Sequence, residues 1–174
     1  MPKRLYILMT GALFALSLGM LPSMAWAAAQ HQETLQEATM PDNFELFPRG
    51  GANTAYARYF VGNSYLNMLS TEGVIIGNVT FEPACRNNWH IHHATKGGGQ
   101  ILLCTAGRGW YQEWGKPARE LHPGDVVHIP AGVRHWHGAA KDSWFVHIAV
   151  EVPGENTRNE WLDPVSDDEY AQLP

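Results

Sequence analysis

Seven of the chain's nine histidines fall between residues 89 and 138. Four of them form two His-x-His pairs, His90-Ile91-His92 and His135-Trp136-His137, which stand about 45 residues apart. In a β-strand, residues i and i+2 point to the same face, so each pair can aim two imidazoles at one point. Neutral imidazole is a common protein ligand of transition metals. The spacing therefore predicts a metal site where two such strands are neighbours.

The elements that must position these histidines are short strands separated by turns. Strand patterns occupy residues 74–81, 100–104, 110–114, 125–129 and 144–152. Turn signals such as Gly107-Arg108-Gly109 and Pro130-Ala131-Gly132 lie between them, without a convincing helix. A further strand pair is expected around the turn signal Gly62-Asn63. Many short strands at this spacing are typical of an all-β fold that closes into a barrel or jelly roll.

The alternation is clearest in the last of these strands. Its two faces carry different residues: Trp144, Val146, Ile148, Val150 and Val152 on one, and Phe145, His147, Ala149 and Glu151 on the other. The first face could pack inside the chain or supply the contact of a homodimer, which we expect as the oligomeric state. The second face places His147 among apolar neighbours, either as an acid–base group of a pocket or as a core histidine.

The chain outside this region is expected to be organised differently. Residues 1–27 predict a cleaved signal peptide, with basic Lys3 and Arg4, an uncharged apolar run and an A-x-A site at residues 25–27. A retained membrane anchor is the alternative, and cleavage implies a periplasmic or secreted protein. Residues 28–73 are expected to form an N-terminal arm and the first strands, 74–152 the barrel, and 153–174 a tail. A capping box at Ser166 and Glu169 predicts a short helix in that tail.

Composition narrows the class of protein further. A length of 174 residues with 45% hydrophobic and 17% charged residues fits one folded domain. The formal net charge of −5, without a basic stripe, argues against nucleic-acid binding. After signal cleavage no apolar span remains for a membrane. Cys85 and Cys104 could form a disulfide in an oxidising compartment, or remain as two buried thiols.

The spacing of the chain's polar residues resembles the two sequence motifs of the cupin superfamily. The first motif is written G-x5-H-x-H-x3-4-E-x6-G and the second G-x5-P-x-G-x2-H-x3-N. The matching positions are Ala84, His90, His92, Gln100 and Gly107 in the first motif, and Gly124, Pro130, Gly132, His135 and Ala139 in the second. The resemblance covers about residues 75–152. It implies a small double-stranded β-helix barrel, here with an N-terminal arm and a short C-terminal helix.

The chain departs from these motifs at three places. Gln100 replaces a glutamate, and Ala139 replaces an asparagine that is often not a ligand. Residues 93–99 also separate His92 from Gln100, where three or four residues are usual. A set of three histidines and a glutamine carries no charge, which makes the bound metal a stronger Lewis acid than a glutamate would. We expect the inserted loop, Lys96 followed by three glycines, to form a flexible rim of the pocket.

The sequence around the histidines is similar to a subgroup of single-domain bacterial cupins. This subgroup includes manganese-dependent hydroxynitrile lyases and cupins associated with carboxymuconolactone decarboxylases. The resemblance implies four metal ligands: His90, His92, Gln100 and His135. It also implies that His147 lies near the metal as a base or substrate contact, and His137 shares the face of His135. The ion implied is divalent, with Mn(II) or Fe(II) favoured and Ni or Zn as alternatives.

The expected function is that of an exported metal-dependent enzyme acting on a small oxygenated organic substrate. The metal would polarise a hydroxyl or carbonyl oxygen while His147 or His137 moves the proton, as lyase or isomerase chemistry requires. An Fe(II)-dependent dioxygenase is an alternative with the same ligands. A non-catalytic periplasmic cupin that binds a metal or a small ligand is another. A shared fold does not decide between these functions.

Overall fold

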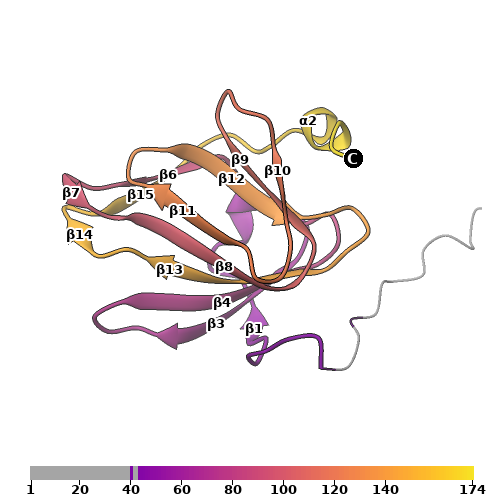
Figure 1. Ribbon diagram of the computed structural model, residues 1–174, viewed down its shortest axis with the longest axis horizontal. Coiled ribbons are helices and arrows are strands. Elements are labelled where there is room, and N and C mark those ends of the chain that lie inside the picture. Colours follow the sequence, from indigo (N-terminus) through magenta and orange to yellow (C-terminus); the bar gives the residue numbers. More distant parts are fainter. Residues whose placement is uncertain (1–39, 41–42) are drawn as a thin grey trace, which may run out of the picture. The chain divides into compact units, whose positions relative to one another are not determined.

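The computed structural model describes residue 40 and residues 43–174, shown in colour in Figure 1. The predicted signal segment, residues 28–39 and residues 41–42 lie outside the described residues. The described residues fall within one compact unit, Ala38–Pro174. None of the helices in this part of the chain is long and apolar enough to span a membrane.

Two antiparallel sheets form a β-sandwich of the jelly-roll type (Figure 1). The first sheet has the order β1 (Gly51–Ala52), β3 (Ser64–Ser70), β4 (Ile75–Phe81), β13 (Phe145–Glu151), β8 (Gly99–Gly107) and β11 (Val126–Pro130). The second has the order β10 (Arg119–Leu121), β9 (Gly109–Glu113), β12 (Arg134–Ala139), β5 (Arg86–Asn87) and β2 (Phe60–Val61), with β6 (His90–His93) and β15 (Arg158–Trp161) attached through β12. The all-β jelly-roll prediction is thereby confirmed.

Strand β13 lies inside the first sheet, paired with β4 on one side and with β8 on the other. Its first four residues are buried, which suits a run rich in Val, Ile and Phe. The face that carries His147, Ala149 and Glu151 lines a cavity that opens to the surface. The sequence alternation separated the two faces of this strand, and the structure shows that the face with His147 lines the cavity.

The turn at Gly62-Asn63 does not join a strand pair, and the prediction of a hairpin there is wrong. Strand β2 pairs with β5 in the second sheet, whereas β3 pairs with β4 in the first. Gly62 adopts a φ of 86°, a left-handed conformation that glycine reaches without a steric penalty. The chain therefore crosses from one sheet to the other at this turn.

The C-terminal tail returns to the barrel instead of ending apart from it. Strand β15 pairs with β6, with Trp161 opposite His90 and Asn159 opposite His92. The predicted helix is present as α2 (Asp167–Ala171), and its capping box at Ser166 and Glu169 is complete. These contacts make the tail part of the wall around the histidine pairs.

The inserted loop is held by that same tail. Strand β7 (Lys96–Gly97) pairs with β14 (Gly154–Glu155) in a separate two-stranded sheet. The amide of Gly98 donates to the carbonyl of Pro153, and Thr95 donates through both its amide and its hydroxyl to the carbonyl of Glu155. These hydrogen bonds join the loop to the tail, and the flexibility expected of the loop stays a prediction.

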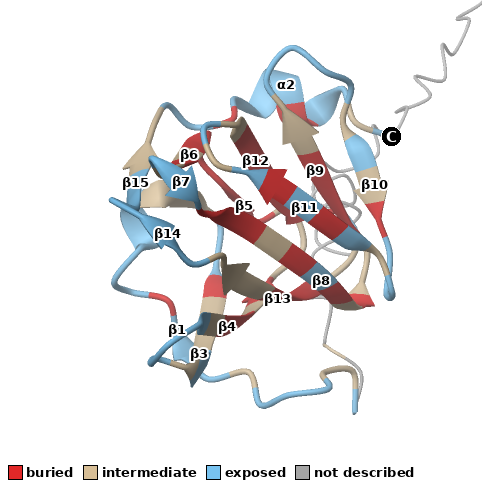
Figure 2. Cartoon of the chain, turned by 60° about the vertical axis from the view of Figure 1, so that its left-hand side comes forward, coloured by how far each residue is buried: buried red, intermediate tan, exposed pale blue. Residues whose placement is uncertain are grey.

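The core lies between the two sheets, where Figure 2 shows buried segments along β8, β9 and β12. Its main cluster contains Phe81, Leu102, Leu121, Ile129 and Phe145 together with both cysteines. The two thiols are free, so the structure shows buried thiols and no disulfide. Burial raises the pKa of Cys104 to about 12 and raises that of Cys85 as well.

We expect both thiols to resist labelling in the folded protein. At pH 8 a buried thiol with a raised pKa is neither accessible nor ionised, and the thiolate is the reactive form. A maleimide reagent followed by mass spectrometry should add nothing to the native chain within an hour. The same treatment in guanidinium chloride should add two labels. Rapid labelling of Cys85 or Cys104 in the native protein would contradict the packing described here.

Candidate metal centre

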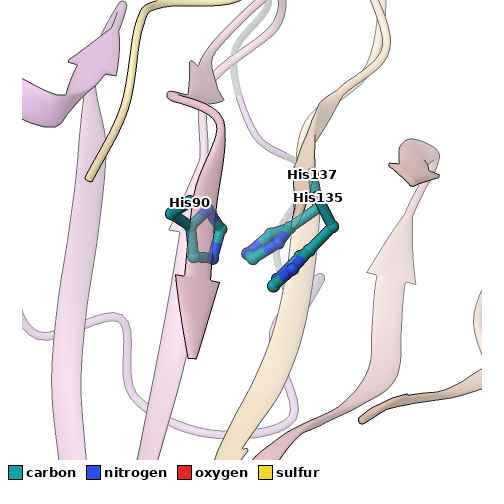
Figure 3. A group of neighbouring side chains, drawn as sticks. All are labelled: His90, His135 and His137. Atoms are coloured by element: carbon teal, nitrogen blue, oxygen red, sulfur yellow. The ribbon is translucent and has the colours of Figure 1, made fainter. Parts of the chain in front are cut away.

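The two predicted histidine pairs lie on neighbouring strands. Strand β12 pairs with β6 so that His135 is directly opposite His90, and their ring centroids are 4.1 Å apart. His92 follows on β6 with its ring 5.5 Å from that of His135. Figure 3 shows His90 extending from β6 toward His135 and His137 on β12. Two segments about 45 residues apart in the sequence therefore bring their imidazoles together.

Three of these histidines could hold a metal ion as they stand. His90, His135 and His137 each offer a ring nitrogen, and the three nitrogens lie within 4.8 Å of one another. This group shares His90 and His135 with the four ligands implied by the sequence resemblance. It adds His137, which was expected to be a pocket residue. The structure thus brings all four histidines of the two pairs to one site.

Hydrogen bonds at Nδ1 orient three of the imidazoles in the same way. His90 Nδ1 lies 2.9 Å from the carbonyl oxygen of Asn88, and His135 Nδ1 lies 2.9 Å from that of Val133. His92 Nδ1 lies 3.0 Å from Oε2 of Glu151. Because these partners only accept, each neutral imidazole must carry its proton on Nδ1. Their Nε2 atoms are then lone-pair donors, which is the form that binds a metal.

Several polar atoms at this site have no partner among the described residues. His92 Nε2, His135 Nε2 and Gln100 Oε1 are buried and accept no hydrogen bond. The Gln100 amide nitrogen donates to Glu151 Oε1 at 3.1 Å, which leaves the amide oxygen free. A buried polar atom without a partner costs about 1–3 kcal/mol. Two imidazole nitrogens and one amide oxygen left unpaired in this way fit the donor set of a divalent transition metal.

The charge state of the histidines also suits metal binding. Burial lowers the pKa of His135 to about 4. Burial, with neighbouring His135 and His92 adding to it, holds the pKa of His90 well below its ordinary value. Both rings are therefore neutral at physiological pH, and a metal does not have to displace a proton from them.

The imidazole of His137 also contacts that of His147. Their rings are 4.8 Å apart and nearly perpendicular. Asn87 holds His137, because its amide nitrogen lies 3.1 Å from His137 Nε2 and its oxygen accepts from the His137 amide. His147 is fully buried, and neither of its ring nitrogens has a partner in the described chain. Burial lowers the pKa of His147 to about 3, so its imidazole is neutral.

A cavity of about 510 Å³ opens onto these groups. Five of the six residues predicted for the site form part of its wall: His90, His92, Gln100, His137 and His147. The sixth, His135, is fully buried and is not part of this wall. Much of the remaining wall is apolar and includes Phe60, Leu66, Val79, Phe81 and Trp161. Such a cavity suits a small organic molecule with an apolar body and one or two polar groups.

Three residues of the site were not identified from the sequence. Glu151 could have been found, because it shares the inward face of β13 with His147 and follows it by four residues. Trp161 gave no signal, since it follows a turn that was read as the end of the barrel. Its ring stacks on His90 at 4.8 Å and on Tyr59 at 4.5 Å. Asn87 lies three residues before His90 and is not a position of either sequence motif, so no signal identified it.

His93 lies apart from the cluster, as strand parity predicts. It is next to His92 in the sequence, but its side chain forms a hydrogen bond with Glu160, with Nε2 and Oε2 2.6 Å apart. Its side chain is partly exposed, at 29%. The adjacent histidine therefore belongs to the outer surface of β6 and not to the candidate metal centre.

Comparisons with known proteins agree with this architecture. The Cupin domain family matches residues 77–150. An (R)-mandelonitrile lyase from Granulicella tundricola is 42% identical over 95 residues, which is 55% of this chain and 70% of the relative. The crystal structure of a cupin-like protein from Thermotoga maritima is 41% identical with a TM-score of 0.65, over 74% of this chain and 96% of that one. Since the sequence motifs, the jelly-roll sheets and these relatives all agree, the chain belongs to the cupin superfamily.

Proposed function

We propose that the protein is a metal-dependent lyase that cleaves small α-hydroxynitriles with an apolar or aromatic body. The observation that carries this proposal is a set of unpaired buried donors: His92 Nε2 and Gln100 Oε1 on the wall of a largely apolar cavity, and His135 Nε2 on the neighbouring strand. The relative from Granulicella tundricola, an (R)-mandelonitrile lyase, supports the reaction class. Export of the protein is part of the proposal and rests on the predicted signal segment alone.

His90, His92, Gln100 and His135 would hold a divalent ion, of which Mn(II) and Fe(II) are the favoured candidates. His137 groups with His90 and His135, and its hydrogen bond to Asn87 favours a role beside the ion. When bound, the ion would supply Lewis acidity that lowers the pKa of the substrate hydroxyl.

The chain's own groups can then complete the cleavage. An unpaired ring nitrogen of His147 accepts the hydroxyl proton, since the imidazole is neutral. The bond between the hydroxyl-bearing carbon and the nitrile carbon breaks as the carbonyl forms. Its electron pair leaves with cyanide, which takes the proton back from His147, so that the products are an aldehyde and hydrogen cyanide. Phe60, Phe81 and Trp161 surround the apolar body of the substrate and limit the entry of water.

The ligand assignment predicts that His135→Ala loses its metal. The residue is buried with an unpaired Nε2, and removal of one donor from a small ligand set weakens binding strongly. Elemental analysis of protein purified without chelator should give about one transition-metal equivalent per chain for the unmodified protein and a small fraction of that for the variant. His122→Ala removes an exposed histidine, at 56% for the side chain, and should keep the metal. Equal metal content in all three proteins would contradict the assignment.

The proton-transfer assignment predicts a large loss of turnover in His147→Phe. Phenylalanine can fill the buried position but cannot accept a proton, and general-base catalysis contributes about 10²–10⁴-fold. The assay follows benzaldehyde released from mandelonitrile by Mn(II)-loaded or Fe(II)-loaded protein, with metal content measured alongside. The unmodified protein should turn over equally under air and nitrogen. A requirement for oxygen would favour a dioxygenase, and saturable binding without turnover would favour a binding protein.

The metal-free protein should lose stability as the pH falls. The pKa of His135 is about 4 and that of His147 about 3 in the folded chain, against an ordinary value of 6.5. As the pH falls, the unfolded chain therefore takes up protons first. The contribution of these histidines to the free energy of unfolding is fully present above pH 6.5 and is lost as the pH falls toward 4 and below. Urea unfolding of chelator-treated protein at pH 7.5, 6 and 5 should show a falling free energy of unfolding. His147→Phe should reduce the slope, and an unchanged slope would argue against His147 as a contributor.

A further inference from the structure

Glu151 contacts two of the proposed ligands at once. Its Oε2 accepts from Nδ1 of His92 at 3.0 Å, and its Oε1 accepts from the amide nitrogen of Gln100 at 3.1 Å. His92 belongs to β6 in the second sheet, whereas Gln100 belongs to β8 in the first. Glu151 ends β13, directly opposite Gln100 in the register of the first sheet. One carboxylate therefore joins the two sheets at the candidate metal centre.

We propose that Glu151 is the positioning residue of the metal centre and fixes both His92 and Gln100 in their metal-binding orientation. This inference rests on the proposed function, since it concerns the ligands assigned there. Glu151 also lies on the wall of the cavity, but this role needs no contact of its own with the substrate or the metal. It acts through the two side chains that its carboxylate holds.

The chemistry of the three groups supports this role. An ionised carboxylate only accepts hydrogen bonds, so both neighbours must present a donor to it. His92 then carries its proton on Nδ1 and leaves Nε2 free. Gln100 turns its NH₂ toward Glu151 and leaves its oxygen free, and both free atoms are buried without partners in the described residues. A glutamine ligand is useful to a metal only through that oxygen.

The position of the negative charge gives the contact a second effect. The ligand set of three histidines and a glutamine is neutral, unlike a set that includes glutamate. Glu151 places a carboxylate one hydrogen bond behind two of the four ligands. Such a partner raises the basicity of a ligating imidazole, and its loss typically costs about 10–100-fold in metal affinity.

The same strands provide a matched control. Glu160 of β15 bonds to His93 of β6, with Oε2 and Nε2 2.6 Å apart. The side chains of Glu160 and Glu151 are similarly exposed, at 40% and 36%. His93, however, lies outside the cluster. Removing the charge of Glu160 therefore changes a glutamate–histidine pair next to the site without changing a proposed ligand.

The test compares Glu151→Gln, Glu151→Asp and Glu160→Gln with the unmodified protein. Metal affinity is measured by competition between the protein and a chromophoric chelator for Mn(II) and for Co(II). We expect Glu151→Gln to bind about 10–100-fold more weakly, because an amide has one acceptor oxygen for two donors. Glu151→Asp keeps the charge but is one methylene shorter, so we expect it to bind more weakly as well. Glu160→Gln should bind like the unmodified protein.

Two further readouts separate positioning from general damage to the fold. Circular dichroism and thermal unfolding of the metal-free variants should match those of the unmodified protein. The visible absorption of the Co(II) form, which reports ligand geometry, should change in the Glu151 variants and not in Glu160→Gln. If Glu151→Gln fails to fold, Glu151→Asp still provides the comparison.

The outcomes distinguish this inference from the proposed function. If the unmodified protein binds no metal, the proposed function fails and this inference fails with it. If the unmodified protein binds metal and the folded Glu151 variants bind it equally well with unchanged Co(II) spectra, only the role of Glu151 is overturned. Equal weakening by Glu160→Gln would also overturn it, because the effect would then be one of nearby charge in general.

Discussion

The antiparallel register between β6 and β12 is the constraint on which the site depends. It places His135 directly opposite His90, and strand parity then brings His92 and His137 to the same side. A shift of one residue in either strand would turn that strand's pair to the opposite face of the sheet. Burial of Trp136 between the members of the second pair opposes such a shift, because the shift would move this indole out of its apolar cluster.

Three of the histidines are oriented by hydrogen bonds at Nδ1. Two of them bond to the carbonyl oxygen two residues earlier, just before their strand begins, so the segment that leads into each strand sets the tautomer of the ring. The third bonds to a carboxylate from the opposite sheet. Main-chain partners of this kind do not depend on side-chain identity, whereas the carboxylate does. The carboxylate partner of His92 lies 59 residues away in the sequence, so a short motif that includes His92 does not reveal it.

Local sequence patterns were sufficient to predict much of the secondary structure. Alternation identified β4 and β13, and a capping box identified α2 because both of its residues lie within four positions. Strand parity also accounts for the separation of His93 from His92. The predicted hairpin at Gly62-Asn63 was wrong. The turn signal is local, but β2 and β3 pair with strands in different sheets. Trp161 and Glu151 were missed as site residues for the same reason, since their contacts join segments about 60–70 residues apart in sequence.

The pairing of β7 with β14 connects two features that looked unrelated in the sequence. One is the longer interval between His92 and Gln100, and the other is the segment that follows the last central strand. In the structure each provides the hydrogen-bonding partner of the other, and β15 then continues along β6. Without β14, the backbone N–H and C=O groups of β7 would lose their hydrogen-bond partners, and the same holds for β14 without β7. The two additions should therefore be inherited together, so that related chains with the short interval between these ligands would also lack the β14 segment.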